Sequence, residues 1–257
     1  MLKIGWFSTG RDEAARQLLQ AVQYKSHRDD INGKISFVFS NREPGEAEES
    51  DVFFELVRSY NIPLVCLSHK KFKTVDEEEE WRIKYDREIN KKVKPFSPDL
   101  CVLAGYMLIV SEELCLKYNM INLHPAPPDG PTGSWQEVIR TLIQNKAETA
   151  GAMIHLVTPE LDRGPVISYC LFPIKDEPFS RYWLSDDKNM LFHLIRQHEL
   201  TREFPLIILT LQALSRGEVD IKDGRIIDAQ GKIISGYNLS DKVDQEVKKS
   251  QDEPYLL

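Results

Sequence analysis

Two polar side chains with catalytic potential stand at the end of an apolar run, in the stretch MINLHPAPPDGPTGSW (residues 120–135). Asn122 and His124 alternate with Ile121 and Leu123, and alternate residues of a strand point to the same face of a sheet. An amide beside an imidazole suits the polarisation of a carbonyl group, because the amide donates to a developing oxyanion and the imidazole donates or transfers a proton. The spacing therefore predicts a catalytic pair, although a single histidine at a strand end is more often structural.

The residues after this pair predict a rigid loop. Proline lacks a backbone N–H and fixes φ, so a cluster of prolines and glycines excludes both strand and helix for about ten residues. A loop of this kind would hold the catalytic pair within the tolerance that chemistry requires. The prolines are Pro125, Pro127, Pro128 and Pro131, and the glycines are Gly130 and Gly133.

Asp162 is the carboxylate best placed in the sequence to tune the imidazole. It lies in TPELDRGP, a turn rich in Pro and Gly that follows a second apolar strand about forty residues after His124. An ordinary turn residue is the alternative interpretation. Neither His124 nor His155 has another potential metal ligand at the spacing that metal sites use, so no metal site is predicted. His155 is expected to pack beside the strand end.

Composition narrows the class of protein. The chain has 257 residues, 42% of them hydrophobic, and a formal net charge of −7, which disfavours a nucleic-acid partner but allows small-molecule substrates. The longest apolar runs, CVLAGYMLIV and FPLIILTLQAL, are about half the length of a membrane span, so no membrane partner is expected. No secretory signal precedes the first strand, and the four widely spaced cysteines suit reduced core residues. We therefore expect a cytoplasmic protein, monomeric or homodimeric.

The first half of the chain predicts alternating strands and helices. Near-continuous apolar strands separated by helical patterns indicate a doubly wound, mostly parallel α/β sheet, in which ligands collect at the carboxyl ends of the strands. The predicted strands are residues 2–7, 34–40, 62–67 and 98–106, and the predicted helices are residues 12–25, 48–60 and 76–94.

The second half has a different pattern. Residues 149–174 predict two short strands joined by a turn, and a long helix is predicted over about 187–215, ending at Arg216-Gly217. Asp-Gly and Gln-Gly turns beyond it predict a small terminal hairpin, and the polar chain after Ser240 is expected to fray. We expect a main domain over residues 1–215, followed by a C-terminal hairpin and polar tail over 216–257.

These motifs together resemble the folate-dependent formyltransferases. The string AGYMLIVS…MINLHPAPPDGP…AGAMIHLVTPELDRGPVI matches a family pattern of AGFM-I-S, then NIHPS-LP, then G-S-H-V-----D-GP-I. The likeness runs from the first strand to about Tyr237, with its specific part at residues 99–174, and is closest to members that formylate glycinamide ribonucleotide. It implies a Rossmann-like formyltransferase that transfers a formyl group from the co-substrate 10-formyltetrahydrofolate to an amine, in purine biosynthesis.

The resemblance also implies roles for the catalytic trio. The family's Asn, His and Asp fall on Asn122, His124 and Asp162, the residues that spacing alone selects. The acceptor amine would attack the formyl carbon, and Asn122 with protonated His124 would stabilise the tetrahedral oxyanion. Asp162 would support the imidazolium and relay protons.

The resemblance places the folate donor against the segment after the AGYM strand. Met107, Leu108, Ile109 and Val110 would lie against the pterin together with Asn122, and residues 156–162 would form the other wall. Simple core packing is the alternative interpretation of YMLIV. The family usually has Arg at the position of Leu108, so a polar contact is lost here, while Arg82 matches a family Arg near the folate or the acceptor.

The acceptor side departs further from the family. The family's SGxGSN phosphate loop is STGRDEAARQ here, and the matched substrate-binding residues are Gly10, Arg11 and Asp12. Asp12 and Glu13 would repel a phosphate unless Arg11 and Arg16 offset them, and Asp12 could equally be a helix N-cap. Glu199 matches a family Glu that contacts the acceptor, with an offset of one residue. Trp135 and Gln136 would reshape the acceptor cleft.

Several functions stay open at this point. Glycinamide ribonucleotide is the first acceptor that the resemblance implies, and an amino-sugar nucleotide or another amine is the nearest alternative. Hydrolysis of formyltetrahydrofolate, with water in place of the amine, is a further alternative. Methionyl-tRNA fits less well, because the C-terminal segment is short and acidic. A non-catalytic folate sensor would have no need of Asn122, His124 and Asp162 together.

Overall fold

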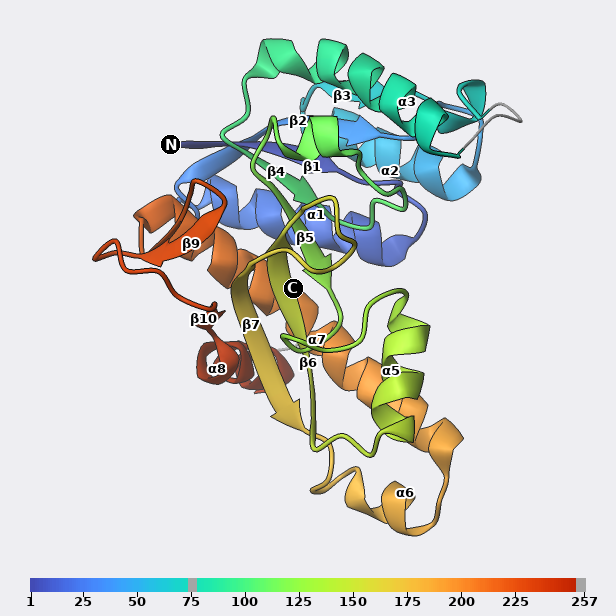
Figure 1. Cartoon of the computed structure of the whole chain (residues 1–257), viewed down its shortest axis with the longest axis vertical. Coiled ribbons are helices and arrows are strands. Elements are labelled where there is room, and N and C mark those ends of the chain that lie inside the picture. The colour runs from blue at the N-terminus through green and yellow to red at the C-terminus, as the bar shows by residue number, and fades with distance from the viewer. Residues whose placement is uncertain (74–77, 253–257) are drawn as a thin grey trace. The chain divides into compact units, whose positions relative to one another are not determined.

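The computed structural model describes residues 1–73 and 78–252 (Figure 1). The strands are β1 (Leu2–Phe7), β2 (Gly33–Ser40), β3 (Leu64–Cys66), β4 (Leu100–Leu103), β5 (Met120–His124), β6 (Thr149–Leu156), β7 (Val166–Pro173), β8 (Val219–Lys222), β9 (Arg225–Asp228) and β10 (Tyr237–Asn238). The α-helices are α1 (Glu13–His27), α2 (Glu48–Ser59), α3 (Glu78–Val93), α4 (Glu112–Cys115), α5 (Trp135–Gln144), α6 (Ser180–Leu184), α7 (Lys188–Arg216) and α8 (Ser240–Asp252). Two short 3-10 helices, η1 (His69–Lys71) and η2 (Lys94–Phe96), flank α3.

The described strands form one eight-stranded sheet and one hairpin. The sheet order is β10-β7-β6-β5-β4-β1-β2-β3, and β8 pairs with β9 separately. The chain forms two compact units, one of residues 1–122 with 157–160 and the other of residues 123–156 with 161–257. The mostly parallel α/β class predicted from the sequence is confirmed. The domain division at residue 215 stays a prediction.

The first unit is a parallel arrangement built on β1. This strand pairs in parallel with β2 and β4. On the outer sides, β3 pairs in parallel with β2, and β5 pairs in parallel with β4. Helix α3 lies on one side of these strands and α1 and α2 on the other (Figure 1). Both faces are therefore covered, which is why these strands read as continuous apolar runs. Trp6, Phe7, Phe37 and Phe39 are fully buried.

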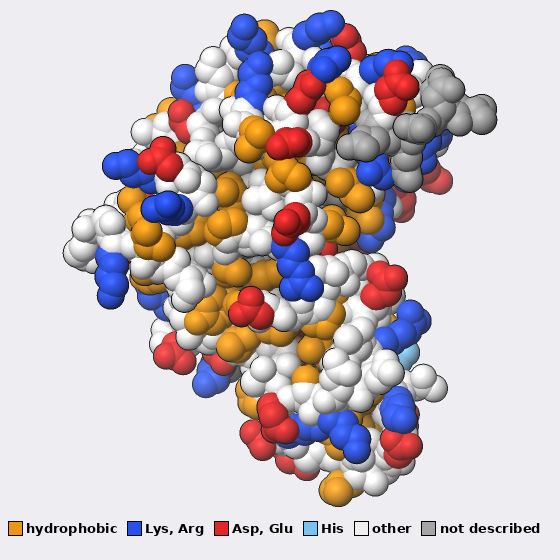
Figure 2. All heavy atoms as spheres, viewed as in Figure 1, with side chains coloured by type: hydrophobic (Ala, Val, Ile, Leu, Met, Phe, Trp, Pro, Cys, Tyr) orange, Lys and Arg blue, Asp and Glu red, His pale blue; other side chains and the backbone are white. Residues whose placement is uncertain are grey.

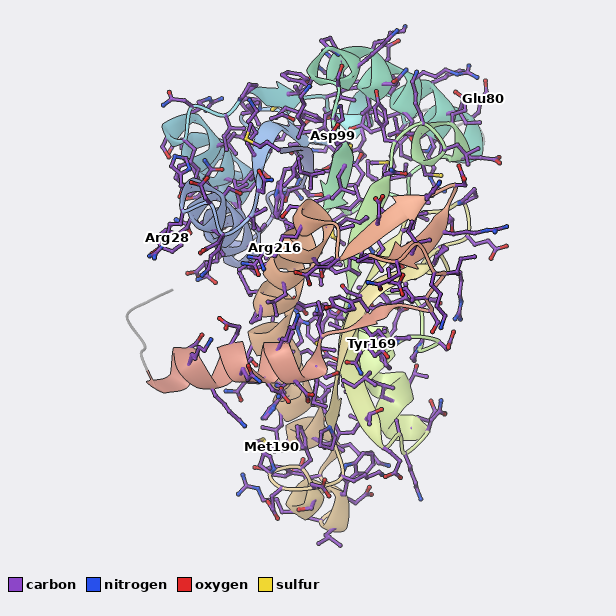
Figure 3. The ribbon with its side chains drawn as sticks, turned by 90° about the vertical axis from the view of Figure 1, so that its left-hand side faces the viewer. Arg28, Glu80, Asp99, Tyr169, Met190 and Arg216 are labelled. Carbon is purple, nitrogen blue, oxygen red and sulfur yellow. The ribbon has the colours of Figure 1, made fainter. Side chains whose placement is uncertain are left out.

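The second unit has an antiparallel pair at its centre. β6 and β7 pair from Thr149 opposite Pro173 to His155 opposite Val166, with a register shift between Ile154 and His155. α7 packs on both strands, and Figure 3 shows Met190 near its first turn and Arg216 at its last. The helix ends at Gly217, as the sequence predicts, and this glycine adopts the left-handed conformation.

Two parts of the second unit differ from the sequence-based expectations. The polar chain after Ser240 was expected to fray, but it forms α8, because Leu239, Val243 and Val247 recur every four residues and are buried. An ion pair between Arg202 and Asp244 (2.9 Å) also joins α8 to α7. The helix α5 was not predicted, although its apolar residues follow a helical period. Its N-terminus carries a capping box formed by Ser134 and Glu137.

Most of the other predicted elements agree with the sequence, but the strand predicted over 98–106 is limited to Leu100–Leu103, and α6 and β10 were not predicted. β1 begins and ends where predicted, and the terminal hairpin is present as β8 and β9 around the Asp223-Gly224 turn. α3 replaces the helix predicted over 76–94, of which residues 76 and 77 lie outside the described ranges. Among the described residues, no helix is both long and apolar enough to cross a membrane. Acidic and basic side chains are interspersed over the face shown in Figure 2.

Gly10 offers a direct test of packing at the end of β1. Its φ is +62°, and a Cβ placed there would lie 2.7 Å from the ring of Phe53, which is fully buried. We expect Gly10→Ala to lower the free energy of unfolding by about 2–4 kcal/mol, since a strained backbone and an overpacked core add together. Urea denaturation measures this loss.

Gly45→Ala is the matched control for that variant. Gly45 has a φ of +85° but nothing within 4 Å of the added Cβ, so only the backbone cost of about 1 kcal/mol should appear. Equal losses in the two variants would show that the packing of Phe53 against Gly10 contributes nothing.

Candidate active site

His124 is the last residue of β5 and is only 3% exposed. Its Nε2 lies 3.1 Å from the carbonyl oxygen of Pro131, so in the neutral ring Nε2 carries the hydrogen and donates it. Its Nδ1 faces the Oδ2 of Asp162 at 3.7 Å. The ring is therefore held between a carbonyl of the proline-rich loop and a carboxylate of the turn after β6.

Asp162 is placed by a tight turn between β6 and β7. Its φ is +55°, a left-handed conformation that Asp tolerates better than most residues. Besides facing His124, its Oδ2 accepts a hydrogen bond from the backbone N–H of Gly133 (3.1 Å), and its Oδ1 lies 3.6 Å from Nε2 of His155. The structure thus brings together His124 and Asp162, which the sequence selected from positions 38 residues apart.

His155 is a member of this cluster that the sequence reasoning missed. It was expected only to pack beside the strand end, yet it is 2% exposed and its ring lies edge-on to His124, with centroids 6.1 Å apart. Its Nδ1 contacts the carbonyl oxygen of Leu156 (3.0 Å), which leaves Nε2 facing Asp162. The available signal was its place one residue before the end of β6, since the turn that follows brings Asp162 back onto that strand end.

Burial and charge act in opposite directions on the two central groups. Burial lowers the pKa of His124, and the Pro131 carbonyl and the Asp162 carboxylate offset this only in part. For Asp162, burial alone would raise the pKa, but contacts with His155, the charge of His124 and the Gly133 N–H together hold it below its ordinary value. A neutral imidazole beside an ionised carboxylate is therefore the resting state near neutral pH.

The proline-rich loop is anchored at several points of the second unit. Neither helix nor strand occurs over residues 125–134, as predicted. Besides the contacts of Pro131 and Gly133, the Arg163 guanidinium donates to the Gly130 carbonyl oxygen (3.4 Å), and the Gly130 N–H donates to the Pro127 carbonyl oxygen (2.9 Å). The loop thus fixes the His124 ring through a backbone carbonyl.

The predicted donor residues lie in the first unit or at its end. Asn122 is half-buried on β5, two residues before His124. In the segment after β4, Met107 and Ile109 are 52% and 42% exposed, whereas Val110 is buried in the core and Leu108 packs against it. The core interpretation therefore holds for the side chain of Val110.

Arg82 lies on α3, where its guanidinium stacks 5.9 Å from the ring of Trp81. Its charge also acts on the buried carboxyl of Asp86. A role for Arg82 at a folate stays a prediction.

The loop after β1 is organised around Asp12. Its Oδ1 accepts from the backbone N–H of Ala15 (3.0 Å), so Asp12 is the N-cap of α1. Arg11 pairs with Asp12 itself (3.2 Å), and Arg16 pairs with Glu49. Both cations that could have offset the acidic loop therefore face carboxylates, and the N-cap interpretation of Asp12 is confirmed.

Glu199 lies on α7 and is completely buried. Within the described part of the chain neither carboxylate oxygen has a hydrogen-bond partner, and Nη1 of Arg196 is 3.6 Å away. Burial, reinforced by the charge of Glu203, raises the pKa of Glu199 to about 9. Arg196 itself lies over the ring of Trp135 at 4.6 Å. Contact between Glu199 and an acceptor stays a prediction.

Comparison with known proteins assigns the family. The family model described as formyl transferase matches residues 2–178, more than half of the chain. The chain belongs to the formyl transferase family. Among the described residues of this formyl transferase, no group of three or more His, Cys, Asp or Glu side chains is arranged to hold a metal ion.

Named relatives of this formyl transferase include two activities. Phosphoribosylglycinamide formyltransferase of Escherichia coli is 31% identical over 159 residues, which cover 61% of this chain and 68% of that protein. Formyltetrahydrofolate deformylase of Haemophilus influenzae is 29% identical over 115 residues, covering 44% and 38% respectively. The structure of the phosphoribosylglycinamide formyltransferase of Coxiella burnetii superposes with a TM-score of 0.71 at 21% identity, over 92% of this chain and 98% of that one, which shows the shared fold.

The His124–Asp162 contact generates a prediction for titration. Because the Asp162 carboxylate raises the pKa of the imidazole against the effect of burial, Asp162→Asn should lower the pKa of His124 further. NMR titration of the His124 ring signals in the variant and in the wild-type protein measures the change. An unchanged or raised value would show that the 3.7 Å contact carries no charge interaction.

The buried Glu199 generates a prediction for stability. The pKa of Glu199 rises from an ordinary 4.5 to about 9. The stability that its neutral form contributes is therefore fully present below pH 4.5 and is lost as the pH rises towards 9. Glu199→Gln mimics the protonated form and should raise the free energy of unfolding by roughly 2–3 kcal/mol at pH 7.5, with little effect at pH 4.5. Urea denaturation at both pH values tests this.

The substitution Glu88→Gln, at a partly exposed position on α3, is the control for Glu199→Gln. Glu88 forms a surface ion pair with Lys91, and such pairs contribute little to stability. A gain in Glu199→Gln that is no larger at pH 7.5 than at pH 4.5 would contradict a protonated, buried carboxyl.

Proposed function

We propose that this formyl transferase moves the formyl group of 10-formyltetrahydrofolate to an amine, with glycinamide ribonucleotide of purine biosynthesis as the acceptor. The observation that carries the proposal is the buried cluster of His124, Asp162 and His155 at the end of β5, beside the proline-rich loop. The acceptor is supported by the name of the Escherichia coli relative, which matches across most of its length.

The proposed reaction is an acyl transfer, which requires hydrogen-bond donors for an oxyanion and a group that transfers protons. The amine nitrogen attacks the formyl carbon, and the carbonyl oxygen becomes an oxyanion. Asn122 and His124 occupy alternate positions of β5 and are proposed to donate to that oxygen. Collapse of the intermediate breaks the bond to N10 of the folate, which takes up one proton while the amine loses one.

Two features adapt His124 to proton transfer. Burial keeps the ring neutral at rest with its hydrogen on Nε2, so Nδ1 is free to accept the proton that the attacking amine releases, relayed through the Asp162 carboxylate. The acquired proton on Nδ1 would face the ionised Asp162, which stabilises the imidazolium. For Nε2 to donate to the oxyanion, its hydrogen bond to Pro131 must be exchanged for the substrate oxygen, so substrate binding and a small movement of the ring are coupled.

On the donor side, the exposed Met107 and Ile109 are proposed to contact the pterin ring, with the backbone of Leu108 and Val110 providing polar contacts. Residues 157–160, which belong to the same unit, are proposed as the opposite wall. Arg82 is proposed to bind the glutamate carboxylates of the folate, since its guanidinium is partly exposed on α3.

Hydrolysis of the same donor is a second candidate, favoured by the loop after β1. The anion-binding position at the start of α1 is filled by Asp12, and Arg11 and Arg16 face carboxylates. A phosphate therefore has no ready site in this loop, whereas water requires none. The Haemophilus influenzae relative is a formyltetrahydrofolate deformylase. The same feature disfavours any acceptor whose phosphate is held at Gly10, Arg11 and Asp12, so another amine, such as an amino-sugar nucleotide, would have to place its phosphates elsewhere.

The proposal includes a cytoplasmic location and a monomer or homodimer acting on small molecules. The cysteines Cys66, Cys101, Cys115 and Cys170 are all free, which suits a reducing compartment. Their thiols are deep enough in the fold that burial raises the pKa of each one.

A formyl-transfer assay decides between the candidates. Purified protein is mixed with 10-formyltetrahydrofolate and glycinamide ribonucleotide, and the deformylated folate is followed by absorbance with and without the acceptor. Turnover that depends on the acceptor supports the transferase. Equal rates without acceptor support the hydrolase, and the absence of turnover with either would contradict both.

His124→Ala tests the role of the imidazole in that assay. We expect kcat to fall by about a hundred- to a thousandfold, as when one oxyanion donor is lost, while tetrahydrofolate still binds. His193→Ala, which removes an exposed histidine from α7, is the matched control and should leave kcat unchanged. A His124→Ala variant with wild-type kcat would exclude a catalytic role for the ring.

A further inference from the structure

Thr9 connects three segments of the first unit through three hydrogen bonds. It is 2% exposed, and its N–H donates to the Gly105 carbonyl oxygen (3.1 Å). Its Oγ1 accepts from the backbone N–H of Met107 (3.0 Å). Its own carbonyl oxygen accepts from Oγ of Ser50 (3.0 Å), which in turn accepts from Nη1 of Arg42 (3.0 Å). Thr9 therefore ties the loop after β1 to the segment after β4 and to α2.

The segment after β4 depends on such anchors, because it contains no regular structure between Ala104 and Ser111. Gly105 adopts a φ of +68°, and the far end is held where the Ser111 N–H donates to Oδ2 of the buried Asp86 (2.6 Å). Tyr106 packs edge-on against Phe7, with ring centroids 5.8 Å apart.

Between these anchors, the side chains alternate in exposure. Leu108 and Val110 point to the core, while Met107 and Ile109 remain 52% and 42% exposed on a backbone held at both ends. The hydroxyl of Thr9 acts in the middle of this segment, directly on the N–H of Met107. It therefore fixes the one residue whose side chain is the most exposed.

We propose that Thr9 is a positioning residue for the donor: its hydroxyl holds Met107, and with it Ile109, in the conformation that receives the folate ring. The inference rests on the proposed function, which places the folate against residues 107–110. Thr9 itself would not touch the reacting atoms. It would act by raising the fraction of molecules in which residues 107–110 have the conformation that binds the folate.

The physical effect of removing the hydroxyl follows from that population. Valine matches threonine in shape but cannot accept a hydrogen bond from the Met107 N–H. In the observed conformation this N–H then has no partner, whereas in other conformations of the segment it can bond to water, so those conformations become more populated. The apparent dissociation constant rises in inverse proportion to the competent fraction. We expect Thr9→Val to weaken tetrahydrofolate binding and to raise KM for 10-formyltetrahydrofolate by about tenfold, with kcat within about twofold of wild type.

Two measurements on Thr9→Val separate this role from general damage. Hydrogen exchange of the Met107 amide, followed by NMR, should accelerate by about tenfold or more, and this readout does not depend on activity. Isothermal titration with tetrahydrofolate gives the affinity. Thr9→Ser retains an acceptor oxygen, so it should restore both the slow exchange and the affinity.

Thr210→Val is the matched control. Thr210 is also fully buried and its Oγ1 also makes hydrogen bonds, with Ser168 (2.5 Å) and Leu206 (2.6 Å) in the second unit. It should lower stability while leaving the Met107 exchange and the folate affinity unchanged.

The outcomes distinguish this inference from the proposed function. Wild-type protein that fails to bind tetrahydrofolate would overturn the proposed function, while the Met107 exchange would still report on the hydrogen bond. Wild-type binding together with unchanged affinity in Thr9→Val would overturn the positioning role alone. Weakened binding that Thr9→Ser does not restore would overturn it as well, since the loss would then not arise from the hydroxyl.

Discussion

The buried carboxylate of Asp162 is the centre on which the candidate site depends. One carboxylate faces two imidazoles and one backbone N–H, those of His124, His155 and Gly133. An ionised carboxylate at this depth is stable only because these groups compensate for the lost water. The same contacts join the turn after β6, the end of β5 and the proline-rich loop, so one side chain defines both the geometry and the electrostatics of the cluster.

The strands and the long helix of the second unit determine where the Asp162 side chain lies. β6 and β7 are antiparallel partners, and the segment of residues 157–165 that joins them is held to the rest of the cluster by the contacts of Asp162. α7 packs on both strands, and the buried contact between Ser168 and Thr210 joins β7 to this helix. Asp162 itself lies outside these elements, in the segment that joins the two strands. Glu199 on the same helix is buried without a hydrogen bond from the described residues to its carboxylate oxygens, and among these residues only the Arg196 guanidinium, 3.6 Å away, compensates its charge.

The sequence predicted what depends on local pattern. The strand at Leu2–Phe7 and the loop after His124 follow from hydrophobic runs and from the restrictions of proline, both of which act over a few residues. The pair His124 and Asp162 was also reached, because each lies at the end of an apolar strand. The structure brings these two together, while their catalytic roles remain proposals.

What the sequence did not reveal depends on side-chain partners that are distant in the chain. His155 becomes part of the cluster only when the turn folds back, and the pairing of Arg16 with Glu49 requires α1 and α2 to be adjacent. The helix α8 was overlooked for another reason, since its polar composition hid the burial of Val243 and Val247. The many polar residues of α8 belong to its exposed side, whereas the regular spacing of its few apolar residues reveals the buried side.

Asp12 carries a consequence for how the protein responds to its substrates. In a loop that binds phosphate, the orphan N–H groups of the helix wait for the ligand, and ligand binding then stabilises the fold strongly. Here the chain supplies its own anion, because the Asp12 carboxylate already accepts from Ala15. At this N–H of α1, the cap is therefore in place without a bound anion. The order of this helix start therefore depends on a carboxylate of the chain itself, one residue before the helix, and not on a bound phosphate.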